Sequence, residues 1–213
     1  MQLSFPDTAT STPLDYELSA KQRGYAAIAG IDEAGRGPLA GPVIAAAVIL
    51  PDSFDLPGLT DSKKLSAKKR DELYPLILSQ ARAFSIGLVS TATIDRVNIL
   101  QGTLLAMQTA VTRLQIPADY LLVDGISKIP LSTPQLTIKQ GDSRSLSIAA
   151  ASVLAKVVRD RIMCAFARHY PQYGFAEHKG YGTAAHLAAI ARFGPSPLHR
   201  KSFRGVREYV PEP

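Results

Sequence analysis

The chain has 213 residues, of which 46% are hydrophobic and 20% are charged, so it can bury a core of its own. This composition excludes a globally disordered protein, and the length favours one domain over two. The longest unbroken apolar run, from Val43 to Leu50, is far shorter than the roughly 20 residues that a membrane-spanning helix needs. We therefore expect no membrane span.

The net charge of +6 is distributed unevenly along the chain. The first 20 residues contain Asp7, Asp15 and Glu17 but no Lys or Arg, so the remaining 193 residues carry 24 basic against 15 acidic groups. A basic surplus attracts polyanions, of which nucleic acid is the commonest. The charge therefore indicates a nucleic-acid partner, with anionic metabolites and membrane surfaces as alternatives.

The start of the chain and its one cysteine indicate the compartment. The first ten residues have neither a basic start nor an apolar stretch, so we expect no secretory signal. A single cysteine, Cys164, cannot form an internal disulfide or hold a structural zinc by itself, which fits a reducing cytoplasm. Cys164 and Met107 lie on apolar helical faces and are expected in the core. The chain has no coiled-coil heptads, so a monomer is expected.

The composition divides the chain into three parts. Residues 1–22 mix Ser, Thr, Pro and acids without periodicity and are interpreted as a flexible N-terminal extension. Residues 23–195 form the predicted main domain. Residues 196–213 form a predicted basic helical tail that packs on this domain.

The first predicted elements form a hairpin and a helix. Apolar segments over 25–32 and 43–50 predict two antiparallel strands joined by a glycine-rich turn. Ser66 is expected to cap a helix over 66–79. A third apolar segment, over 84–89, predicts the next strand.

The later elements alternate between helices and strands. In order they are a helix over 94–114, strands over 120–123 and 136–139, and helices over 141–169 and 183–192. The segment Gly141-Asp142-Ser143 is expected to open the long helix. Strands that alternate with helices predict an α/β fold, and the hairpin makes part of its sheet antiparallel. The sequence therefore predicts a mixed sheet flanked by helices.

Acidic residues follow two of the predicted strands. Asp32 and Glu33 end the first strand, and Asp124 ends the strand over 120–123. Ligands of open α/β sheets bind at strand ends, so adjacent strands would hold these acids close together. Carboxylates about 4 Å apart repel by on the order of 4 kcal/mol at an effective dielectric near 20, so they must take up protons or bind cations. Oxygen ligands favour Mg²⁺ or Mn²⁺, and two such ions commonly cleave phosphodiesters.

Each acid also has a purely structural interpretation. Asp124 with Gly125 is a common turn pair, and Asp142 could cap the long helix. Asp32 and Glu33 could be solvated turn residues. The joint position of the acids beside glycine turns in a basic chain favours chemistry over these interpretations.

Three further features could contact a nucleic acid. The turn Gly35-Arg36-Gly37 permits close backbone approach to a sugar or phosphate, although it could be a plain tight turn. It is neither a P-loop nor a dinucleotide fingerprint, which counts against ATP and NAD. The basic patch Ser62-Lys63-Lys64, continued by Lys68, Lys69 and Arg70, suits phosphates or is a solvated helix face. Tyr181, between two glycines, could stack on a sugar or base, or pack locally.

Five separated segments together resemble bacterial ribonuclease HII, a type 2 ribonuclease H. They are IDEAGRGPLAGPV from Ile31, DSKKL from Asp61, LLVDG from Leu121, GDSRSLSIAAASVLAKVVRD from Gly141 and HKGYGT from His178. The similarity runs from about Gly24 to Phe203. The resemblance implies a ribonuclease H-like fold, which is a five-stranded mixed β-sheet flanked by helices with a small helical C-terminal extension.

The resemblance also implies an activity and a set of site residues. Members of this family hydrolyse the RNA strand of RNA–DNA hybrids and nick DNA duplexes 5′ to embedded ribonucleotides, which leaves 3′-hydroxyl and 5′-phosphate ends. By resemblance the catalytic residues are Asp32, Glu33, Asp124 and Asp142, with Asp32, Glu33 and Asp124 holding Mn²⁺ or Mg²⁺, two ions when substrate is bound. The substrate-binding residues are Gly35, Arg36 and Gly37 at the 2′-hydroxyl, Tyr181 at the next sugar, and Ser62, Lys63 and Lys64 at phosphates.

Two other functions stay open at this point. A protein of the same fold could bind nucleic acid without cleaving it, and its acids would then serve turns and caps. A different phosphodiesterase of the same fold, such as a Holliday-junction resolvase or a transposase-like nuclease, would cut all-DNA substrates. Absence of cleavage would distinguish the binding protein from a ribonuclease H, and substrate preference distinguishes the other nucleases.

Overall fold

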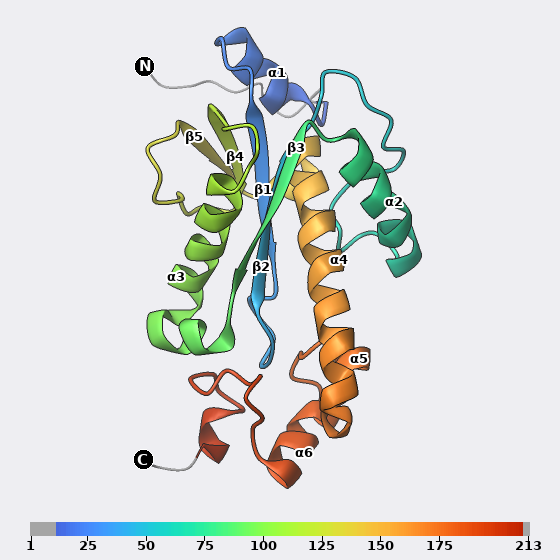
Figure 1. Ribbon diagram of the computed structural model, residues 1–213, viewed down its shortest axis with the longest axis vertical. Coiled ribbons are helices and arrows are strands. Elements are labelled where there is room, and N and C mark those ends of the chain that lie inside the picture. Colours follow the sequence, from blue (N-terminus) through green and yellow to red (C-terminus); the bar gives the residue numbers. More distant parts are fainter. Residues whose placement is uncertain (1–11, 211–213) are drawn as a thin grey trace.

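A computed structural model describes residues 12–210 and shows a five-stranded sheet between helices (Figure 1). The strands are β1 (Ile28–Ala34), β2 (Val43–Ile49), β3 (Ala83–Val89), β4 (Tyr120–Asp124) and β5 (Gln135–Ile138). The helices are α1 (Asp15–Gln22), α2 (Ala67–Gln80), α3 (Thr91–Thr112), α4 (Leu146–His169), α5 (Phe175–His178) and α6 (Ala184–Phe193). Short 3₁₀ turns lie at Gly141–Ser143, Pro171–Tyr173 and Arg207–Tyr209. None of the helices in this described part is long and apolar enough to cross a bilayer.

The strand order β3-β2-β1-β4-β5 makes the sheet mixed, which confirms the predicted fold class. β1 pairs with β2 and β2 with β3 in antiparallel fashion, as the predicted hairpin requires. β1 runs parallel to β4, and β4 runs parallel to β5. In the β1–β4 register Ile31 lies opposite Val123, so Asp32 and Asp124 come next on neighbouring strands. The predicted adjacency of these two acids is therefore confirmed.

Helices cover both faces of the sheet, so β2, which lies between β1 and β3, is apolar throughout. All seven residues of β2 are buried, and alternate ones belong to two separate clusters. Ala45 and Ala47 pack with residues of α3 such as Ala106. Ile44 and Ala46 share the other cluster with residues of α2 and α4. A strand buried on both sides reads as a continuous apolar run, which is why 43–50 was the longest one in the sequence.

The N-terminal segment departs from its predicted flexibility. Residues 15–22 form α1, and Glu17 of this helix is only 6% exposed. Its carboxylate accepts hydrogen bonds from the Ser145 hydroxyl (2.7 Å) and the Ser147 amide (3.0 Å) at the start of α4. A negative charge at a helix N-terminus is stabilised by the free amide groups there. The prediction of a mobile extension was wrong for α1, whereas residues 1–11 lie outside the described part of the chain.

Two predicted helices have different boundaries in the structure. α4 starts at Leu146, where Ser145 accepts a hydrogen bond from the Ile148 amide, so Gly141–Ser143 is a separate turn rather than the opening of the helix. Asp142 is therefore not its cap. α3 is interrupted at Asn98 (φ 69°, ψ 169°), whose side-chain oxygen accepts from the Leu100 amide and restarts the helix. A positive φ is uncommon for a residue other than glycine, and the two hydrogen bonds that the Asn98 side chain accepts from the Leu100 and Gln101 amides stabilise it here.

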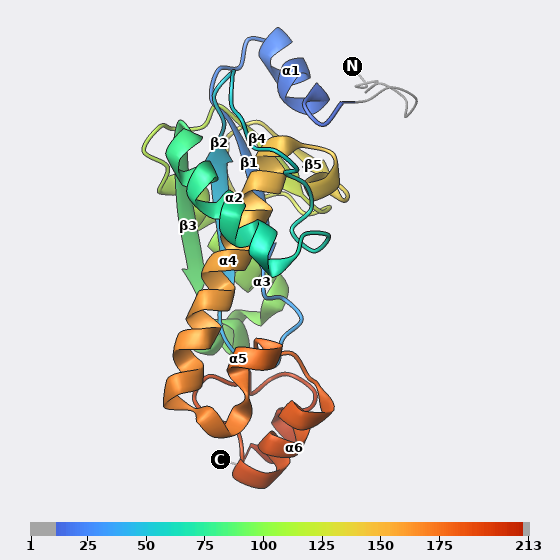
Figure 2. The same ribbon diagram turned by 90° about the vertical axis from the view of Figure 1, so that its right-hand side faces the viewer.

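Residues 171–210 form a small lobe beyond the end of α4 (Figures 1 and 2). Short backbone hydrogen bonds fasten this lobe to the loop between β1 and β2, which we call the glycine loop (residues 35–42). The Leu39 amide donates to the Gly180 carbonyl and the Gly41 amide donates to the Leu198 carbonyl, both at 2.8 Å. Within the described part of the predicted tail over 196–213, only Arg207–Tyr209 is helical. The helical tail was therefore wrong there, because hydrogen bonds to the glycine loop hold this segment in turns.

Two buried histidines of the lobe hydrogen-bond to each other. His186 Nδ1 lies 2.9 Å from the Tyr181 carbonyl, and its Nε2 lies 3.0 Å from His199 Nε2. His199 Nδ1 accepts from the Ser196 amide at 2.9 Å. This chain of bonds assigns one proton to each ring, so both histidines are neutral. Burial lowers the pKa of His199 to about 4, with the neighbouring His186 as the second cause, and burial also lowers the pKa of His186.

The neutral histidine pair predicts a loss of stability in mild acid. An unfolded histidine titrates near pH 6.5, whereas folded His199 resists protonation until about pH 4. Stability is therefore fully present above about pH 6.5 and falls as the pH drops toward 4, since the unfolded state binds more protons. We expect the free energy of unfolding in urea to fall between pH 7 and pH 5, and to fall less in His199→Gln. His169→Gln, which changes a surface ring, is the control; an equal pH dependence in His199→Gln and wild type would contradict the assignment.

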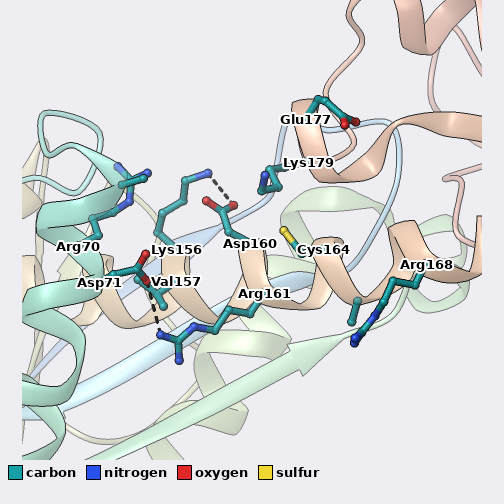
Figure 3. Close-up of a pocket in the computed structure, with 12 residues that line it drawn as sticks. Arg70, Asp71, Lys156, Val157, Asp160, Arg161, Cys164, Arg168, Glu177 and Lys179 are labelled. Atoms are coloured by element: carbon teal, nitrogen blue, oxygen red, sulfur yellow. Dashed lines mark hydrogen bonds and ion pairs between the residues drawn. The ribbon is translucent and has the colours of Figure 1, made fainter. Parts of the chain in front are cut away.

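A groove of about 720 Å³ lies along α4, between α2 and α5 (Figure 3). Five basic side chains line it against three acidic ones: Arg70, Lys156, Arg161, Arg168 and Lys179 against Asp71, Asp160 and Glu177. Cys164 also faces this groove and is exposed, so its expected place in the core was wrong. Met107 is 3% exposed and does belong to the core.

Candidate active site

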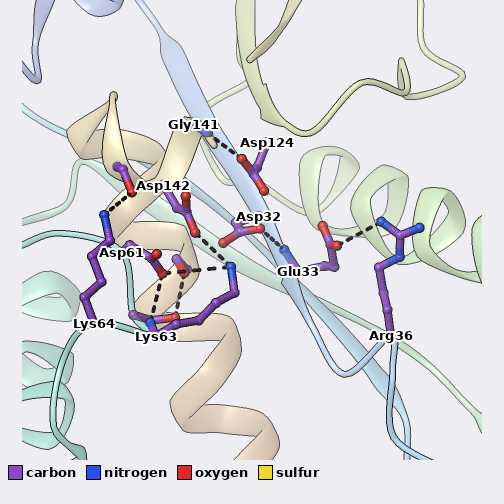
Figure 4. A network of polar contacts seen from close by, with 12 residues as sticks. Asp32, Glu33, Arg36, Asp61, Lys63, Lys64, Asp124, Gly141 and Asp142 are labelled. Carbon is purple, nitrogen blue, oxygen red and sulfur yellow. Dashed lines mark hydrogen bonds and ion pairs between the residues drawn. The ribbon is translucent and has the colours of Figure 1, made fainter. Parts of the chain in front are cut away.

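Three aspartates meet where the parallel strands end (Figure 4). Asp32 lies in β1, Asp124 ends β4, and Asp142 lies in the turn that follows β5. Each offers a carboxylate oxygen, and these oxygens all lie within 4.8 Å of one another. Residues distant in sequence are thus held together by the parallel pairing of β1, β4 and β5.

Asp32 is the most deeply buried of the three carboxylates, with 2% exposure. Its Oδ1 accepts from the Glu33 amide at 2.7 Å, whereas its Oδ2 is buried without a hydrogen-bond partner among the described residues. Burial raises the pKa of Asp32 well above its usual range, and the charges of Glu33 and Asp124 raise it further. A divalent cation would neutralise this cluster and satisfy the orphaned oxygen, so the donor set fits Mg²⁺ or Mn²⁺.

Asp142 is held by a lysine from the predicted basic patch. Lys63 Nζ lies 2.9 Å from Asp142 Oδ2 and 3.9 Å from Asp61 Oδ1. Burial raises the pKa of Asp142, and the Lys63 ammonium opposes this shift. The Asp124 carboxylate is oriented by the Gly141 amide at 2.6 Å. The turn before α4 therefore positions two of the three acids.

Glu33 lies beside the three-aspartate cluster but is not a member of it. Successive strand residues point to opposite faces, so its side chain leaves β1 on the other side from Asp32. Its Oε1 lies 3.4 Å from Arg36 Nη1. Burial raises the pKa of Glu33, which Arg36 lowers in turn. The cluster thus contains Asp142 in place of Glu33 in the predicted metal set, and a metal role for Glu33 stays a prediction.

A pocket of about 220 Å³ brings most of the other predicted residues to the acids. Its lining comprises Asp32, Glu33, Gly35, Arg36, Gly37, Ser62, Lys63, Asp124, Lys156, Arg159 and Tyr181, together with Ala34. Tyr181 is 46% exposed, and its ring lies 3.8 Å from where a Cβ on Gly37 would stand. The glycine loop and Tyr181 therefore form one wall of the pocket. Lys64 and Asp142 line an adjoining pocket of about 350 Å³.

The predicted basic patch divides into exposed and buried parts. Lys63 and Lys64 are exposed, and Lys64 Nζ donates to the Ser143 hydroxyl at 3.0 Å. Ser62 is only 3% exposed, and its hydroxyl hydrogen-bonds to Ser152 at 2.7 Å. The two lysines are therefore available to a phosphate, whereas the Ser62 side chain packs against α4.

Sequence reasoning missed two arginines beneath the pocket. Arg159 and Arg200 are 1% and 0% exposed. The signal for Arg159 was its place on the buried face of α4, where Ser152, Ala155, Arg159 and Met163 follow one another at intervals of three or four residues. Arg200 lies among turns and has no such periodic signal.

Comparison with known proteins agrees with this arrangement. The family model for ribonuclease HII matches residues 29–206. The ribonuclease HII of Syntrophotalea carbinolica is 66% identical over 206 residues, which cover 97% of this chain and 98% of that protein. The ribonuclease H2 of Pyrococcus horikoshii superposes with a TM-score of 0.72 at 22% identity, covering 86% of this chain and 97% of that one. A Bst ribonuclease HIII in complex with Mn²⁺ superposes with a TM-score of 0.63 at 19% identity, covering 97% and 75%.

Acids clustered at the strand ends of this mixed sheet define a metal-dependent nuclease, an enzyme that hydrolyses phosphodiester bonds. The family match covers most of the chain, and the Syntrophotalea protein is similar over nearly its whole length. The chain belongs to the ribonuclease HII family. Its activity is therefore that of a ribonuclease H, which acts on RNA–DNA hybrids.

Proposed function

We propose that this ribonuclease H also nicks DNA duplexes 5′ to embedded ribonucleotides, leaving 3′-hydroxyl and 5′-phosphate ends. The observation that carries the proposal is the shared pocket of Asp32, the glycine loop and Tyr181. Only the 2′-hydroxyl distinguishes a ribonucleotide from its DNA neighbours. The residues that recognise this hydroxyl must therefore lie beside the phosphate that is cleaved. The glycine loop lies beside the acids in this pocket, so it is in a position to bind the hydroxyl next to the cleaved phosphate.

The acids would share the work of metal binding and catalysis. Asp32, Asp124 and Asp142 are the donors brought together by the strands, and Glu33 is a fourth donor at the pocket wall. Two Mn²⁺ or Mg²⁺ ions bound there with substrate would supply an activated water and stabilise the leaving oxygen. Lys63 would neutralise Asp142 before the ions bind, because its ammonium lies 2.9 Å from that carboxylate.

The remaining pocket residues would recognise the substrate. Amide groups of Gly35, Arg36 and Gly37 are suited to the 2′-hydroxyl, since glycines allow close backbone approach. The exposed ring of Tyr181 would stack on the next sugar. Lys63 and Lys64 would contact backbone phosphates, with Ser62 contributing chiefly to packing. All of these groups come from one chain, so a monomer would suffice to bind and cleave the substrate. We propose that it acts in the cytoplasm.

The test of this proposal is a nicking assay on a labelled DNA duplex that contains one ribonucleotide. With Mg²⁺ or Mn²⁺ we expect a single cut 5′ to the ribonucleotide and no cut in an all-DNA duplex of the same sequence. Cutting of the all-DNA duplex would indicate a resolvase-like or transposase-like nuclease instead. Binding without cleavage by either metal would indicate a nucleic-acid-binding protein that retains the fold.

The number of metal ions can be tested separately. Titration of Mn²⁺ into the enzyme with bound ribonucleotide duplex, followed by electron paramagnetic resonance, should give two bound ions per active site. The Bst ribonuclease HIII of the same fold, solved with Mn²⁺, supports the choice of this ion. One ion per substrate-bound, active enzyme would count against two-metal catalysis.

The basic groove along α4 would extend the nucleic-acid contact beyond the pocket. Lys156 lines both hollows, so a phosphate backbone could pass from one to the other. Each lost phosphate contact lowers the slope of log affinity against log salt by about 0.9 for duplex DNA. Arg161→Gln with Arg168→Gln should therefore reduce the slope by about two, measured by fluorescence anisotropy. Arg113→Gln, which changes an exposed arginine at the end of α3, is the control. An unchanged slope in the double variant would show that the groove does not contact the phosphate backbone.

A further inference from the structure

Arg200 is buried directly behind the glycine loop and hydrogen-bonds to its backbone. Its Nη1 donates to the Arg36 carbonyl at 2.7 Å and its Nη2 to the Gly35 carbonyl. Nε and Nη2 also donate to the Gly41 carbonyl at 3.1 and 2.9 Å. One guanidinium thus holds three carbonyls of the loop, a task for which its rigid fork of donors is suited.

Arg159 supports the same loop from α4. Its Nε donates to the Pro42 carbonyl at 3.1 Å and its Nη2 to the Ala40 carbonyl at 3.0 Å. A Cβ on Gly35 would lie 2.1 Å from Arg159 Nε, so the loop is packed tightly on this side chain. The guanidinium also lies 6.0 Å from the centre of the Tyr181 ring. Arg159 therefore contacts both elements of the pocket wall.

The hydrogen bonds from Arg200 to the loop carbonyls determine the direction in which the loop amides point. In a planar trans peptide the C=O and N–H groups point in opposite directions. Because the carbonyls of Gly35 and Arg36 are drawn inward to Arg200, the amides of Arg36 and Gly37 point outward. No hydrogen bond within the described part of the chain uses these two amides. Arg36 and Gly37 are also exposed, so both amides are free to donate to a ligand in the pocket.

The two arginines keep their charge without a carboxylate. Neither forms a salt bridge among the described residues, and Arg159 Nη1 is buried with no hydrogen-bond acceptor there. Burial lowers the pKa of Arg200 to about 9, with the charge of Arg159 as the second cause, and burial also lowers the pKa of Arg159. Arginine side chains keep their proton at neutral pH. The Asp95 carboxylate fixes the adjacent backbone by accepting from the amides of Lys201 and Ser202 at 2.9 Å. A buried positive charge behind outward amides favours an anionic or oxygen-rich ligand.

We infer that Arg200, supported by Arg159, is a positioning residue for ribose recognition: it holds the glycine loop so that the Arg36 and Gly37 amides meet the 2′-hydroxyl and the phosphate beside it. This inference rests on the proposed function of the loop. It assigns a role in specificity to two arginines that act through the loop whose carbonyls they hold.

The test measures the ratio of affinities for a ribonucleotide-containing duplex and an all-DNA duplex. It compares this ratio between variants in which the arginines behind the glycine loop are changed. Asp32→Asn is the parent, so that the duplex is bound with Mg²⁺ but not cut. Arg200→Lys and Arg159→Lys are each added to it, since lysine keeps the charge but loses the fork. Arg192→Lys, an exposed arginine of α6, is the matched control. Affinities for a single-ribonucleotide duplex and an all-DNA duplex are measured on the same preparation, so that a reduced folded fraction cancels from their ratio.

We expect the parent and the Arg192→Lys control to prefer the ribonucleotide duplex equally. Arg200→Lys should lower this preference by about fivefold, the factor that one lost hydrogen bond of ordinary strength gives, with all-DNA affinity within about twofold of the parent. A preference retained in Arg200→Lys would overturn the inference. Should Arg200→Lys not fold, as judged by circular dichroism, Arg159→Lys decides in the same way. A parent without any preference would instead contradict the proposed function of the loop.

Discussion

Replacing Asp32 with Asn is expected to lower the rate of hybrid cleavage by about a hundredfold to a thousandfold while affinity for the hybrid stays the same or rises. The change keeps the shape of a side chain that is 2% exposed but removes a charge from the three-aspartate cluster. Cations held by carboxylates lose a ligand, and losses of preorganised electrostatic stabilisation typically cost about 10²–10³ in rate. Affinity is preserved because a negative charge near phosphate is removed. Single-turnover cleavage and anisotropy binding measure the two effects separately.

Asp52→Asn provides the matched control for this experiment. Asp52 is an exposed carboxylate that pairs with Lys21 of α1, outside the cluster and outside the groove along α4. Its replacement should leave the cleavage rate within about twofold, since exposed ion pairs contribute little. Equal activity of Asp32→Asn and wild type would remove Asp32 from the catalytic residues.

Replacing Gly30 with Ala is expected to destabilise the fold by about 3 kcal/mol or more, because overpacking against backbone cannot be relieved by a rotamer change. A Cβ on Gly30 would lie 2.1 Å from the Ser147 carbonyl carbon and 2.3 Å from the Ile148 amide nitrogen. Gly30 therefore lets the start of α4 lie against β1, two residues before Asp32. The free energy of unfolding in urea measures the loss, and residual activity should fall with it as α4 moves away from the acids.

Gly102→Ala is the control for Gly30→Ala. A Cβ on Gly102, in α3, would come no closer than 3.3 Å to another atom, the Ile94 side-chain carbon Cγ1, and would otherwise make ordinary contacts with Val89 Cγ1 (3.6 Å) and Ile94 Cα (3.8 Å). Alanine also favours a helix by about 1 kcal/mol over glycine. We expect this variant to be within about 1 kcal/mol of wild type. Equal stability of Gly30→Ala and Gly102→Ala would contradict the packing of α4 on β1.

The sheet and its acid pair could be predicted because they follow local patterns. Apolar segments of strand length mark all five strands, and the glycine-rich connection between 25–32 and 43–50 marks the hairpin. The alternation of strands and helices then makes the strands of Asp32 and Asp124 parallel, which their register confirms. The glycines next to these acids identified the loop that lines the same pocket.

Features decided by distant contacts could not be predicted from local pattern. Composition suggested a flexible start, but Glu17 of α1 meets the N-terminus of α4 only in the folded chain. The segment that contains Asp142 was predicted to open the long helix, because the turn at Gly141–Ser143 lies just before the true cap, Ser145. Arg200 is held by carbonyls of a loop more than 150 residues earlier, so no spacing in the sequence reveals it.

The acid cluster as the metal centre is tested most directly by anomalous diffraction from crystals of the protein soaked in Mn²⁺ with a ribonucleotide-containing duplex. The structure predicts anomalous density within coordinating distance of the carboxylates of Asp32, Asp124 and Asp142. Density at this cluster in wild type, and its loss in Asp32→Asn, would confirm that the strand ends form the catalytic metal site. Density elsewhere, with none beside Asp32 in crystals that cleave the duplex, would contradict this account.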